Sequence, residues 1–435
     1  MVDLRNLRYF VLFDNNLTGQ LPKGLYNISS IEEIDVGNNR LNGSFPSDIG
    51  LTLPRLSFLR VSNNSFSGLI PPSLSNASTL EEIYFHSNNF TGPIPKDLGR
   101  LPQLQVLFFA QNQLQDDLSF IDSLVNCSRL QDIAFGGNFL TGSIPRSLAN
   151  LSTELSSIDL SENQLSGAIP IGIQHLTGLE RMYLYQNFLS GPIQDINFTR
   201  LPRLQRLNIG NNHLTGSIPT SIGNLDMLSL VAMNYNNLSG GIPPSLGRCP
   251  SLLYLDLSHN NLSGTIAKEV FSQGSPLVVL VLLSNRLTGS LPPEVGLLRN
   301  LGALYVSDNK LVGLIPDSIA RCIVMEELNL SGNYFAGEIP NALSSLRGLR
   351  ILDISSNNFS GEIPDFLSSA SGLTLLNLSA NQLQGEVPRD GVFLNASAVS
   401  VFGNSDLCGG ISELKLPPCL NSKKKENNLH LEKVF

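Results

Sequence analysis

The stretch Leu352-Asp353-Ile354-Ser355-Ser356-Asn357-Asn358-Phe359-Ser360-Gly361-Glu362-Ile363-Pro364 has the skeleton L-x-I-x-x-N-x-F-x-G-x-I-P. This skeleton recurs sixteen times, and one Asn marks the phase of each copy. The marker residues are Asn15, Asn39, Asn64, Asn88, Asn112, Asn138, Asn163, Asn187, Asn212, Asn236, Asn260, Asn285, Asn309, Asn333, Asn357 and Asn381. Successive markers are 24 or 25 residues apart, and 26 only once. Self-similarity at this period indicates a solenoid, in which each repeat packs on its neighbours.

The residue types at the fixed positions of one repeat can be explained physically. Around Asn260, the alternation of Leu255 and Leu257 with other residues predicts a short strand with one face buried. Asn260 stands where the strand ends and the chain bends inward. Its buried amide should therefore bond backbone groups of the turn and of the adjacent repeat. Gly264 supplies a backbone conformation that a Cβ would obstruct.

The period and the pattern L-x-x-L-x-L-x-x-N-x-L are typical of a leucine-rich repeat. We therefore predict an α/β solenoid, a leucine-rich-repeat superhelix of about 16 repeats of 24 residues. It should have a parallel concave β-sheet and 3-10 or helical turns on its convex side. The repeats are expected over residues 1–390, a C-terminal cap over 391–420 and a disordered tail over 421–435. No N-terminal capping unit is visible, so Leu7, Phe10 and Leu12 should be uncovered.

The fifth repeat, within residues 104–130, departs from the pattern. Asp116 takes the place of the ladder Gly, and no I-P step follows. The longest step between marker residues also falls here. We expect a helical turn on the convex side, with Leu118, Ile121 and Leu124 packing inward.

The five cysteines are of two kinds. Cys127, Cys249 and Cys322 occupy equivalent positions in different repeats. With a strand spacing of about 4.8 Å, the nearest two would be roughly 14 Å apart, so they are expected as buried free thiols. Cys408 and Cys419 follow the last repeat. A bridge between them would close a loop of about twelve residues and contribute roughly 3 kcal/mol, which suits a cap.

Charge and hydropathy exclude some functions. The net charge is −8, and no basic stripe alternates with aromatic residues, so nucleic acid is not an expected partner. No run of eighteen apolar residues occurs, and residues 1–20 show no signal peptide. We expect a fragment of a longer protein that meets a membrane only through a segment absent here.

Glycosylation signals of the form N-x-S/T are dense. Many are by-products of the repeat turn itself, so they carry little information. Six lie outside that turn, and with a bridged cap they favour a secreted chain. The six are Asn27, Asn76, Asn126, Asn150, Asn197 and Asn395.

Exposed aromatic and basic residues on the concave strands are the candidate ligand contacts. Such residues dominate binding energy when they gather on a rigid surface. We predict as ligand-binding the residues Tyr84, His86, Phe108, Arg181, Tyr183, Tyr185, Arg206, Tyr235, Tyr254 and Tyr305.

Catalysis is the competing class. Glu82, Asp132, Asp159 and Glu162 could in principle supply a carboxylate pair for glycoside hydrolysis. An open concave sheet, however, offers no pocket that excludes water or shifts a pKa. No Ser-His-Asp pattern, metal-ligand cluster or phosphate loop is visible, so we predict no enzyme, no cofactor and no metal.

The repeat L-x-x-L-x-L-S-x-N-x-L-S-G-x-I-P closely resembles the extracellular domain of plant leucine-rich-repeat receptor kinases. The resemblance covers residues 1 to about 420. Residues 118–130, Leu-Ser-Phe-Ile-Asp-Ser-Leu-Val-Asn-Cys-Ser-Arg-Leu, resemble the D-x-x-F-x-x-S-L-x-N-C-S-x-L signature of a subfamily containing receptors for bacterial peptides. Residues 402–410 and 416–419 resemble the C-terminal cap of that subfamily.

This resemblance implies perception of an extended peptide, microbial or endogenous, on the concave face in defence signalling. It also implies a co-receptor kinase ectodomain as partner and a parent protein at the extracellular face of the plasma membrane. The family's signal peptide, Cys-paired N-terminal cap, membrane helix and Ser/Thr kinase are not found in this sequence. The alternative is a soluble leucine-rich-repeat inhibitor of microbial cell-wall-degrading enzymes, which has similar but fewer repeats and lacks the irregular fifth repeat.

Overall fold

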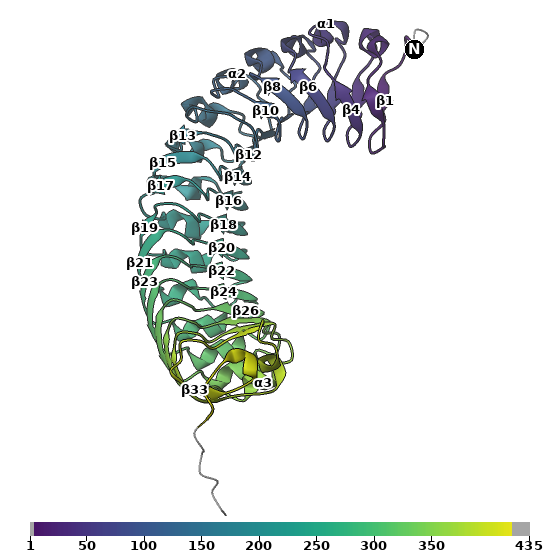
Figure 1. The fold of residues 1–435 in the computed structure, drawn as a ribbon. Coiled ribbons are helices and arrows are strands. Elements are labelled where there is room, and N and C mark those ends of the chain that lie inside the picture. The colour runs from purple at the N-terminus through teal and green to yellow at the C-terminus, as the bar shows by residue number, and fades with distance from the viewer. Residues whose placement is uncertain (1–3, 420–435) are drawn as a thin grey trace, which may run out of the picture.

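The computed structural model describes residues 4–419, which form a curved arc with the first and last described repeats far apart (Figure 1). One parallel sheet of 17 strands lines the concave side, and each repeat contributes one strand. Its strands are β1 (Tyr9–Val11), β3 (Glu33–Asp35), β5 (Phe58–Arg60), β7 (Glu82–Tyr84), β9 (Val106–Phe108), β11 (Asp132–Ala134), β12 (Ser157–Asp159), β14 (Arg181–Tyr183), β16 (Arg206–Asn208), β18 (Leu230–Ala232), β20 (Tyr254–Asp256), β22 (Val279–Val281), β24 (Ala303–Tyr305), β26 (Glu327–Asn329), β28 (Ile351–Asp353), β30 (Leu375–Asn377) and β32 (Val399–Ser400). The predicted leucine-rich-repeat solenoid is confirmed.

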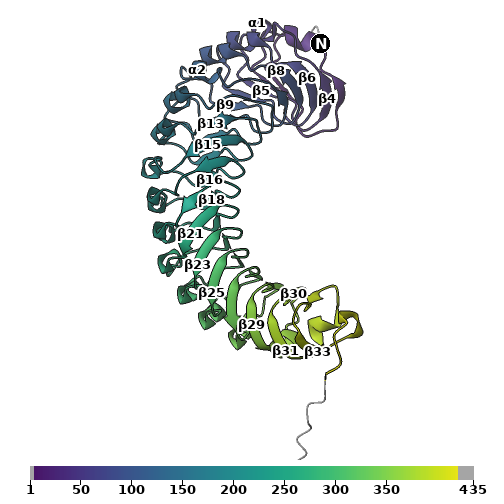
Figure 2. The same cartoon turned by 60° about the vertical axis from the view of Figure 1, so that its left-hand side comes forward.

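The convex side carries a row of short helices (Figure 2). Three are α-helical, namely α1 (Ile49–Thr52), α2 (Ile121–Leu124) and α3 (Phe366–Ser369). The others are 3-10 turns, η1 (Lys23–Asn27), η2 (Pro72–Asn76), η3 (Lys96–Arg100), η4 (Arg146–Asn150), η5 (Ile171–His175), η6 (Phe198–Arg200), η7 (Thr220–Asn224), η8 (Pro244–Arg248), η9 (Lys268–Val270), η10 (Pro293–Leu297), η11 (Asp317–Arg321), η12 (Asn341–Ser345), η13 (Gly391–Leu394) and η14 (Ser412–Leu414). The Pro of the I-P step precedes most of them in extended conformation, which suits a residue that lacks a donor and fixes φ.

A second set of parallel strands, which the sequence analysis did not predict, runs along one flank of the arc. In most repeats it is built by the residues around a positive-φ Gly, such as Gly264. It has three parts. The first contains β2 (Thr18–Gln20), β4 (Arg40–Gly43), β6 (Ser65–Leu69), β8 (Asn89–Gly92) and β10 (Gln113–Leu114), and the second contains β13 (Ser166–Gly167), β15 (Phe188–Pro192) and β17 (His213–Thr215). The third contains β19 (Ser239–Gly240), β21 (Asn261–Thr265), β23 (Arg286–Gly289), β25 (Lys310–Gly313), β27 (Tyr334–Gly337), β29 (Asn358–Glu362), β31 (Gln382–Val387) and β33 (Asp406–Gly409). The first interruption falls at the irregular fifth repeat.

The marker Asn residues join neighbouring repeats, as predicted. The amide nitrogen of Asn260 donates to the carbonyls of Leu257 and Ser258 in its own turn and, at 2.9 Å, to that of Met233 in the preceding repeat. Its amide oxygen accepts from the backbone N–H of Leu238 at 3.0 Å. Since this pattern recurs along the arc, each buried Asn satisfies backbone groups that the turn leaves unpaired.

The two ends of the described chain differ. Leu7 and Phe10 are only partly buried and Leu12 is exposed. At the other end the concave sheet continues past residue 390 through β32, and Asn404 makes three of the four bonds that Asn260 makes. The predicted tail, including Lys423, Lys424 and Lys425, lies outside the described residues.

The irregular repeat and the cysteines follow the sequence-based expectations. Leu118, Ile121 and Leu124 are fully buried around α2, and Asp116 accepts the backbone N–H of Ile94 at 2.9 Å. The structure contains the Cys408–Cys419 disulfide. The free cysteines are buried, and burial raises the pKa of each thiol to about 11; they are Cys127, Cys249 and Cys322.

Candidate functional site

The parallel register aligns the concave residues in columns across the repeats. Arg181 stands between Ser157 and Arg206, and Tyr183 stands between Asp159 and Asn208. We define the concave face by four residues of each repeat. Two are the first and third residues of the strand. After the strand comes one further inward-facing residue, and the two residues that follow it complete the set. Its outward side chains are therefore held in fixed positions by backbone bonds on both sides.

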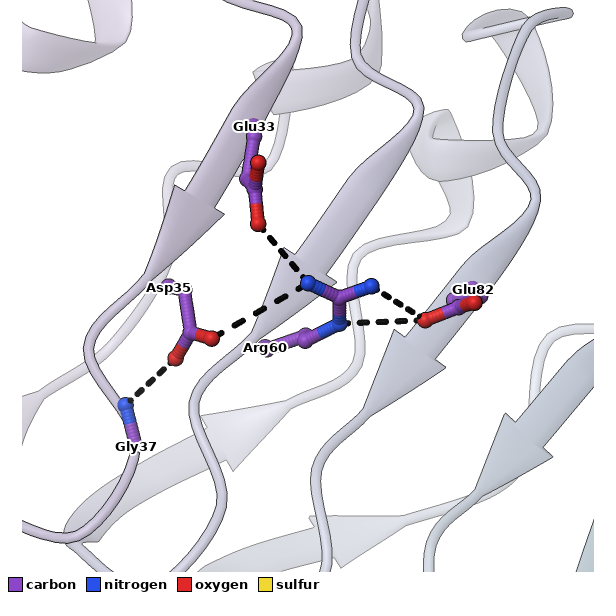
Figure 3. Close-up of polar contacts among 5 residues, drawn as sticks. All are labelled: Glu33, Asp35, Gly37, Arg60 and Glu82. Carbon is purple, nitrogen blue, oxygen red and sulfur yellow. Dashed lines mark hydrogen bonds and ion pairs between the residues drawn. The ribbon is translucent and has the colours of Figure 1, made fainter. Parts of the chain in front are cut away.

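A charge network lies at the N-terminal part of this face (Figure 3). The guanidinium of Arg60 contacts Glu82 on one side, at 2.6 Å, and Glu33 on the other, at 2.7 Å. It also lies 4.0 Å from Asp35, whose carboxylate accepts the backbone N–H of Gly37. Arg60 is thus occupied by three carboxylates and is not a free cation for a ligand.

An aromatic group adjoins this network. The ring of Tyr84 meets that of Phe108 edge-on at 5.0 Å, and His86 lies within 6.2 Å of both. Burial raises the pKa of Tyr84 and lowers that of His86. The Nδ1 atom of His86 is buried without a hydrogen-bond partner among the described residues.

The concave face is hollowed at the sixth repeat. The hollow encloses about 300 Å³ and is lined by His86, Phe108, Ala110, Gln111, Gly136, Gly137, Asp159, Ser161, Glu162 and Tyr185. The physical reason is the pair Gly136 and Gly137, which occupies positions where most repeats carry side chains. A Cβ on Gly136 would lie 2.8 Å from both Asp159 Oδ1 and Ser161 Oγ, so a larger residue would fill the floor. We call this depression the glycine-floored hollow.

Two carboxylates, those of Asp159 and Glu162, line the glycine-floored hollow. Asp159 Oδ1 accepts the backbone N–H and the hydroxyl of Ser161, at 3.0 and 2.5 Å. One oxygen of Glu162 accepts the hydroxyl of Tyr185 at 3.1 Å. Among residues 4–419, no Lys, Arg or His lies within 4.0 Å of either carboxylate. The hollow is therefore acidic and partly aromatic.

The remaining predicted contacts fall into two groups. Some are engaged within the protein. Arg181 pairs with Asp132, Tyr254 bonds Asp256 at 3.4 Å, and Tyr305 bonds Glu327. Burial first, and then the bond to Glu327, raise the pKa of Tyr305 to about 12.

The other group is available to a ligand. Arg206 is exposed, and among the described ion pairs it has no carboxylate partner. Tyr183 is half-buried beside it in the neighbouring column. Tyr235 is 49% exposed and stacks on His259 with ring centroids 3.9 Å apart. The structure thus gathers Tyr84, His86, Phe108 and Tyr185 near one hollow, whereas the other candidates are spread along the arc.

Sequence analysis missed one recurrent arrangement. In several repeats the third strand residue is Asp or Asn and caps the Ser two positions later, as in Asp159, Asp256, Asn329, Asp353 and Asn377. The signal was visible as D/N-x-S at fixed phase. These side chains therefore hold the end of the strand, and this structural role of Asp159 weakens its interpretation as one member of a catalytic pair. Within residues 4–419 no three His, Cys, Asp or Glu side chains are grouped to hold a metal ion.

The six glycosylation signals outside the repeat turn are all exposed. Several lie at the ends of convex helices, such as Asn27 in η1 and Asn76 in η2. Their accessibility meets the first requirement for modification and leaves the concave face open. No helix in the described part of the chain is both long and apolar enough to cross a bilayer.

Comparisons with known proteins identify the family. Leucine-rich-repeat family descriptions match residues 153–214, residues 248–271 and six single repeats between residues 6 and 370. The crystal structure of a TDR receptor superposes with a TM-score of 0.85 at 29% identity, covering 93% of this chain and 73% of that one. The ectodomain of the Arabidopsis receptor kinase HAESA, solved with an IDA peptide hormone ligand, gives a TM-score of 0.75 at 31% identity, over 93% of this chain and 76% of that one. The chain belongs to the leucine-rich-repeat ectodomains of plant receptor kinases.

A curated relative of this ectodomain is the LRR receptor-like serine/threonine-protein kinase EFR of Arabidopsis thaliana. The two are 51% identical over 45 residues, which is 10% of this chain and 4% of EFR. The chain thus matches only a small part of the length of its curated relatives.

Proposed function

We propose that this chain is the ligand-binding ectodomain of a plant receptor-like kinase and binds an extended peptide along its concave face. The observation that carries the proposal is the concave face itself. It combines a preformed sheet, half-buried and exposed aromatic residues and a hollow at the sixth repeat. HAESA, which shares the fold at 31% identity, was solved with a peptide hormone ligand. A rigid sheet loses little freedom on binding, so ordering the peptide is the main cost.

The dimensions of the face set the ligand length. Repeats three to thirteen span ten strand spacings of about 4.8 Å, roughly 48 Å in all. At about 3.3 Å per extended residue, this length accommodates some fourteen or fifteen residues. An aromatic or charged contact is available at several points along it, at Tyr84, Tyr183, Arg206 and Tyr235.

The finer parts of the proposal rest on the sequence signatures. The irregular fifth repeat and the C-terminal cap resemble a subfamily that contains receptors for bacterial peptides, so we place the function in defence signalling. We further propose a co-receptor kinase ectodomain as partner, which closes on the ligand near the last repeats. The parent protein would then be a glycoprotein at the extracellular face of the plasma membrane.

The test is a binding selection with the purified ectodomain. Arrayed 15-residue peptides from bacterial proteins and from plant secreted proteins would be compared with pectin-degrading enzymes as probes. The proposal expects selected peptides whose affinity falls at least tenfold on Tyr183→Ala together with Tyr185→Ala, in a variant with an unchanged melting curve. Binding of the enzymes and of no peptide would instead support a soluble inhibitor. Unchanged peptide affinity in the folded variant would place the binding site elsewhere.

A further inference from the structure

We propose that the glycine-floored hollow is a subsite for one cationic side chain, lysine or arginine, of the bound peptide. The inference rests on the proposed function, because it assigns the peptide residue that the concave face would select. Its support comes from the shape, the charge and the aromatic walls of the hollow.

The shape of the hollow comes from missing side chains. Gly136 lies in the column that carries Ala110 in the preceding repeat and Ser161 in the next, and Gly137 lies beside Gln111 and Glu162. At this one repeat both residues lack a side chain, while the corresponding residues of the preceding and following repeats carry one. The volume of about 300 Å³ is large enough for a long side chain with its water, and small enough to exclude a folded domain.

The charge of the hollow is not balanced within the protein. Asp159 uses Oδ1 to cap Ser161, and Glu162 uses one oxygen for Tyr185. Among the described residues, the second oxygen of each carboxylate has no hydrogen-bond partner. Elsewhere on this face the carboxylates Glu33 and Glu82 share Arg60, and Asp132 pairs with Arg181. The hollow therefore presents negative charge that a ligand can neutralise.

The aromatic lining suits the rest of a cationic side chain. Phe108 from repeat five and Tyr185 from repeat eight both line the hollow. Aromatic faces attract ammonium and guanidinium groups and pack against their methylene stems. His86 lies on the same wall as Phe108, and burial lowers its pKa, so it adds no competing positive charge near neutral pH. An acidic ligand group would face two carboxylates, which disfavours it.

The concave face also offers a matched control. Asp353 in β28 caps Ser355 through Oδ1 at 3.0 and 2.6 Å, the same arrangement that Asp159 makes with Ser161. Asp353 does not line the hollow, and its other oxygen accepts the amide of Asn377. Asp353→Asn therefore tests the local effect of losing a capping carboxylate without touching the hollow.

Disulfide capture of small thiols measures the preference of the hollow without its natural peptide. Ala110→Cys places a thiol on the lining, and Ala380→Cys places one at an exposed concave position in repeat sixteen. Each variant is equilibrated with cysteamine, 2-mercaptoethanol or 3-mercaptopropionate in a fixed redox buffer, and adducts are quantified by mass. The native free thiols are buried, so the wild-type chain is the blank. Cysteamine carries the cation, the second reagent is neutral and the third is anionic.

We expect Ala110→Cys to capture cysteamine roughly tenfold more than 2-mercaptoethanol, since two carboxylates act on it. When Asp159→Asn and Glu162→Gln are added to Ala110→Cys, the preference for cysteamine should fall toward the value for Ala380→Cys. When Asp353→Asn is added instead, the preference should persist. Gly136→Ala is a second variant that should lower it by filling the floor. Equal capture of all three thiols, or a preference unchanged by Asp159→Asn and Glu162→Gln, overturns the subsite.

The outcome is separable from that of the proposed function. Selected peptides that show no preference for Lys or Arg at any position would overturn the subsite and leave peptide binding in place. If disulfide capture shows a preference for the cationic thiol but no peptide is selected, the hollow binds a cation and the claim that a peptide supplies it is overturned. A basic residue enriched at one peptide position, and lost in Asp159→Asn with Glu162→Gln, supports both.

Discussion

The guanidinium of Arg181 lies 3.1 Å from the carboxylate of Asp132, two strands away in the concave sheet. Strand β12 runs between them, and its Ser157 hydroxyl lies 3.3 Å from Arg181 Nε. The two charged residues are 49 positions apart in sequence. The register of the sheet brings them into one column, so a residue predicted as a ligand contact already has a partner inside the protein.

Replacing Arg181 by Ala should therefore change stability only slightly. The arginine side chain is 40% exposed, and partly exposed pairs contribute about 0–1 kcal/mol. Urea unfolding of Arg181→Ala, Asp132→Asn and the double variant would isolate the pair, because the cycle cancels effects that each residue has alone. A coupling above about 2 kcal/mol would contradict this estimate for an exposed pair.

Asn260→Ala should cost far more. The side chain is 8% exposed and takes part in four hydrogen bonds, so its removal leaves buried backbone groups unpaired. We expect a loss of about 1–3 kcal/mol in the free energy of unfolding. Asn208→Ala is the control, since that half-buried side chain accepts one bond, from the N–H of Gly210. Equal losses in the two variants would show that the marker Asn does not join the repeats.

Hydrogen exchange should be uneven along the arc. Tyr9, Val11 and Phe13 in the first repeat are about half exposed, and Asn15 bonds only carbonyls of its own turn. In repeats eight to twelve the marker Asn residues bond both their own and the preceding repeat, as Asn236 does. Backbone amides of repeats one and two should exchange much faster than those of repeats eight to twelve. Uniform protection would contradict this expectation.

Much of the fold was predictable from the sequence because the solenoid repeats one local solution. The burial of Leu255, the bonds of Asn260 and the helical turn after Asp116 each follow from patterns within one or two repeats. The flanking strands were missed because β-propensity is weak in the N-x-x-G-x segment that forms them. Their pairing depends on the stacking of neighbouring turns rather than on local preference.

The candidate site was less predictable for the same reason. Phase in the repeat shows which side chains face the concave side, but not which neighbours they meet. Arg181 was predicted as a ligand contact, and the structure pairs it with Asp132. The glycine-floored hollow depends on an absence, the two residues Gly136 and Gly137. Reading the concave columns for missing side chains, as well as for aromatic ones, would have located it.

The stability of the chain should depend on pH through His86. Burial lowers the pKa of its imidazole below the ordinary value of 6.5, and Nδ1 has no hydrogen-bond partner among the described residues. As pH falls through about 6.5, the unfolded chain binds a proton before the folded chain does, so stability decreases on acidification. The loss is complete once pH is below the lowered folded pKa. Above 6.5 the imidazole is neutral in both states and contributes no dependence.

The measurement is a series of urea unfolding curves between pH 5 and 8 for the wild-type chain and His86→Gln. Glutamine does not titrate, so the difference in unfolding free energy between the two proteins isolates the histidine. His86 lies against Phe108 and Tyr84, whose side chains carry no charge in this range, which leaves the imidazole as the titrating group in that contact. We expect the difference to shift against the wild-type chain as pH drops below 6.5 and to be constant above it. A difference that is constant over the whole range, or that shifts toward the wild-type chain in acid, would show that the folded protein accommodates the imidazolium.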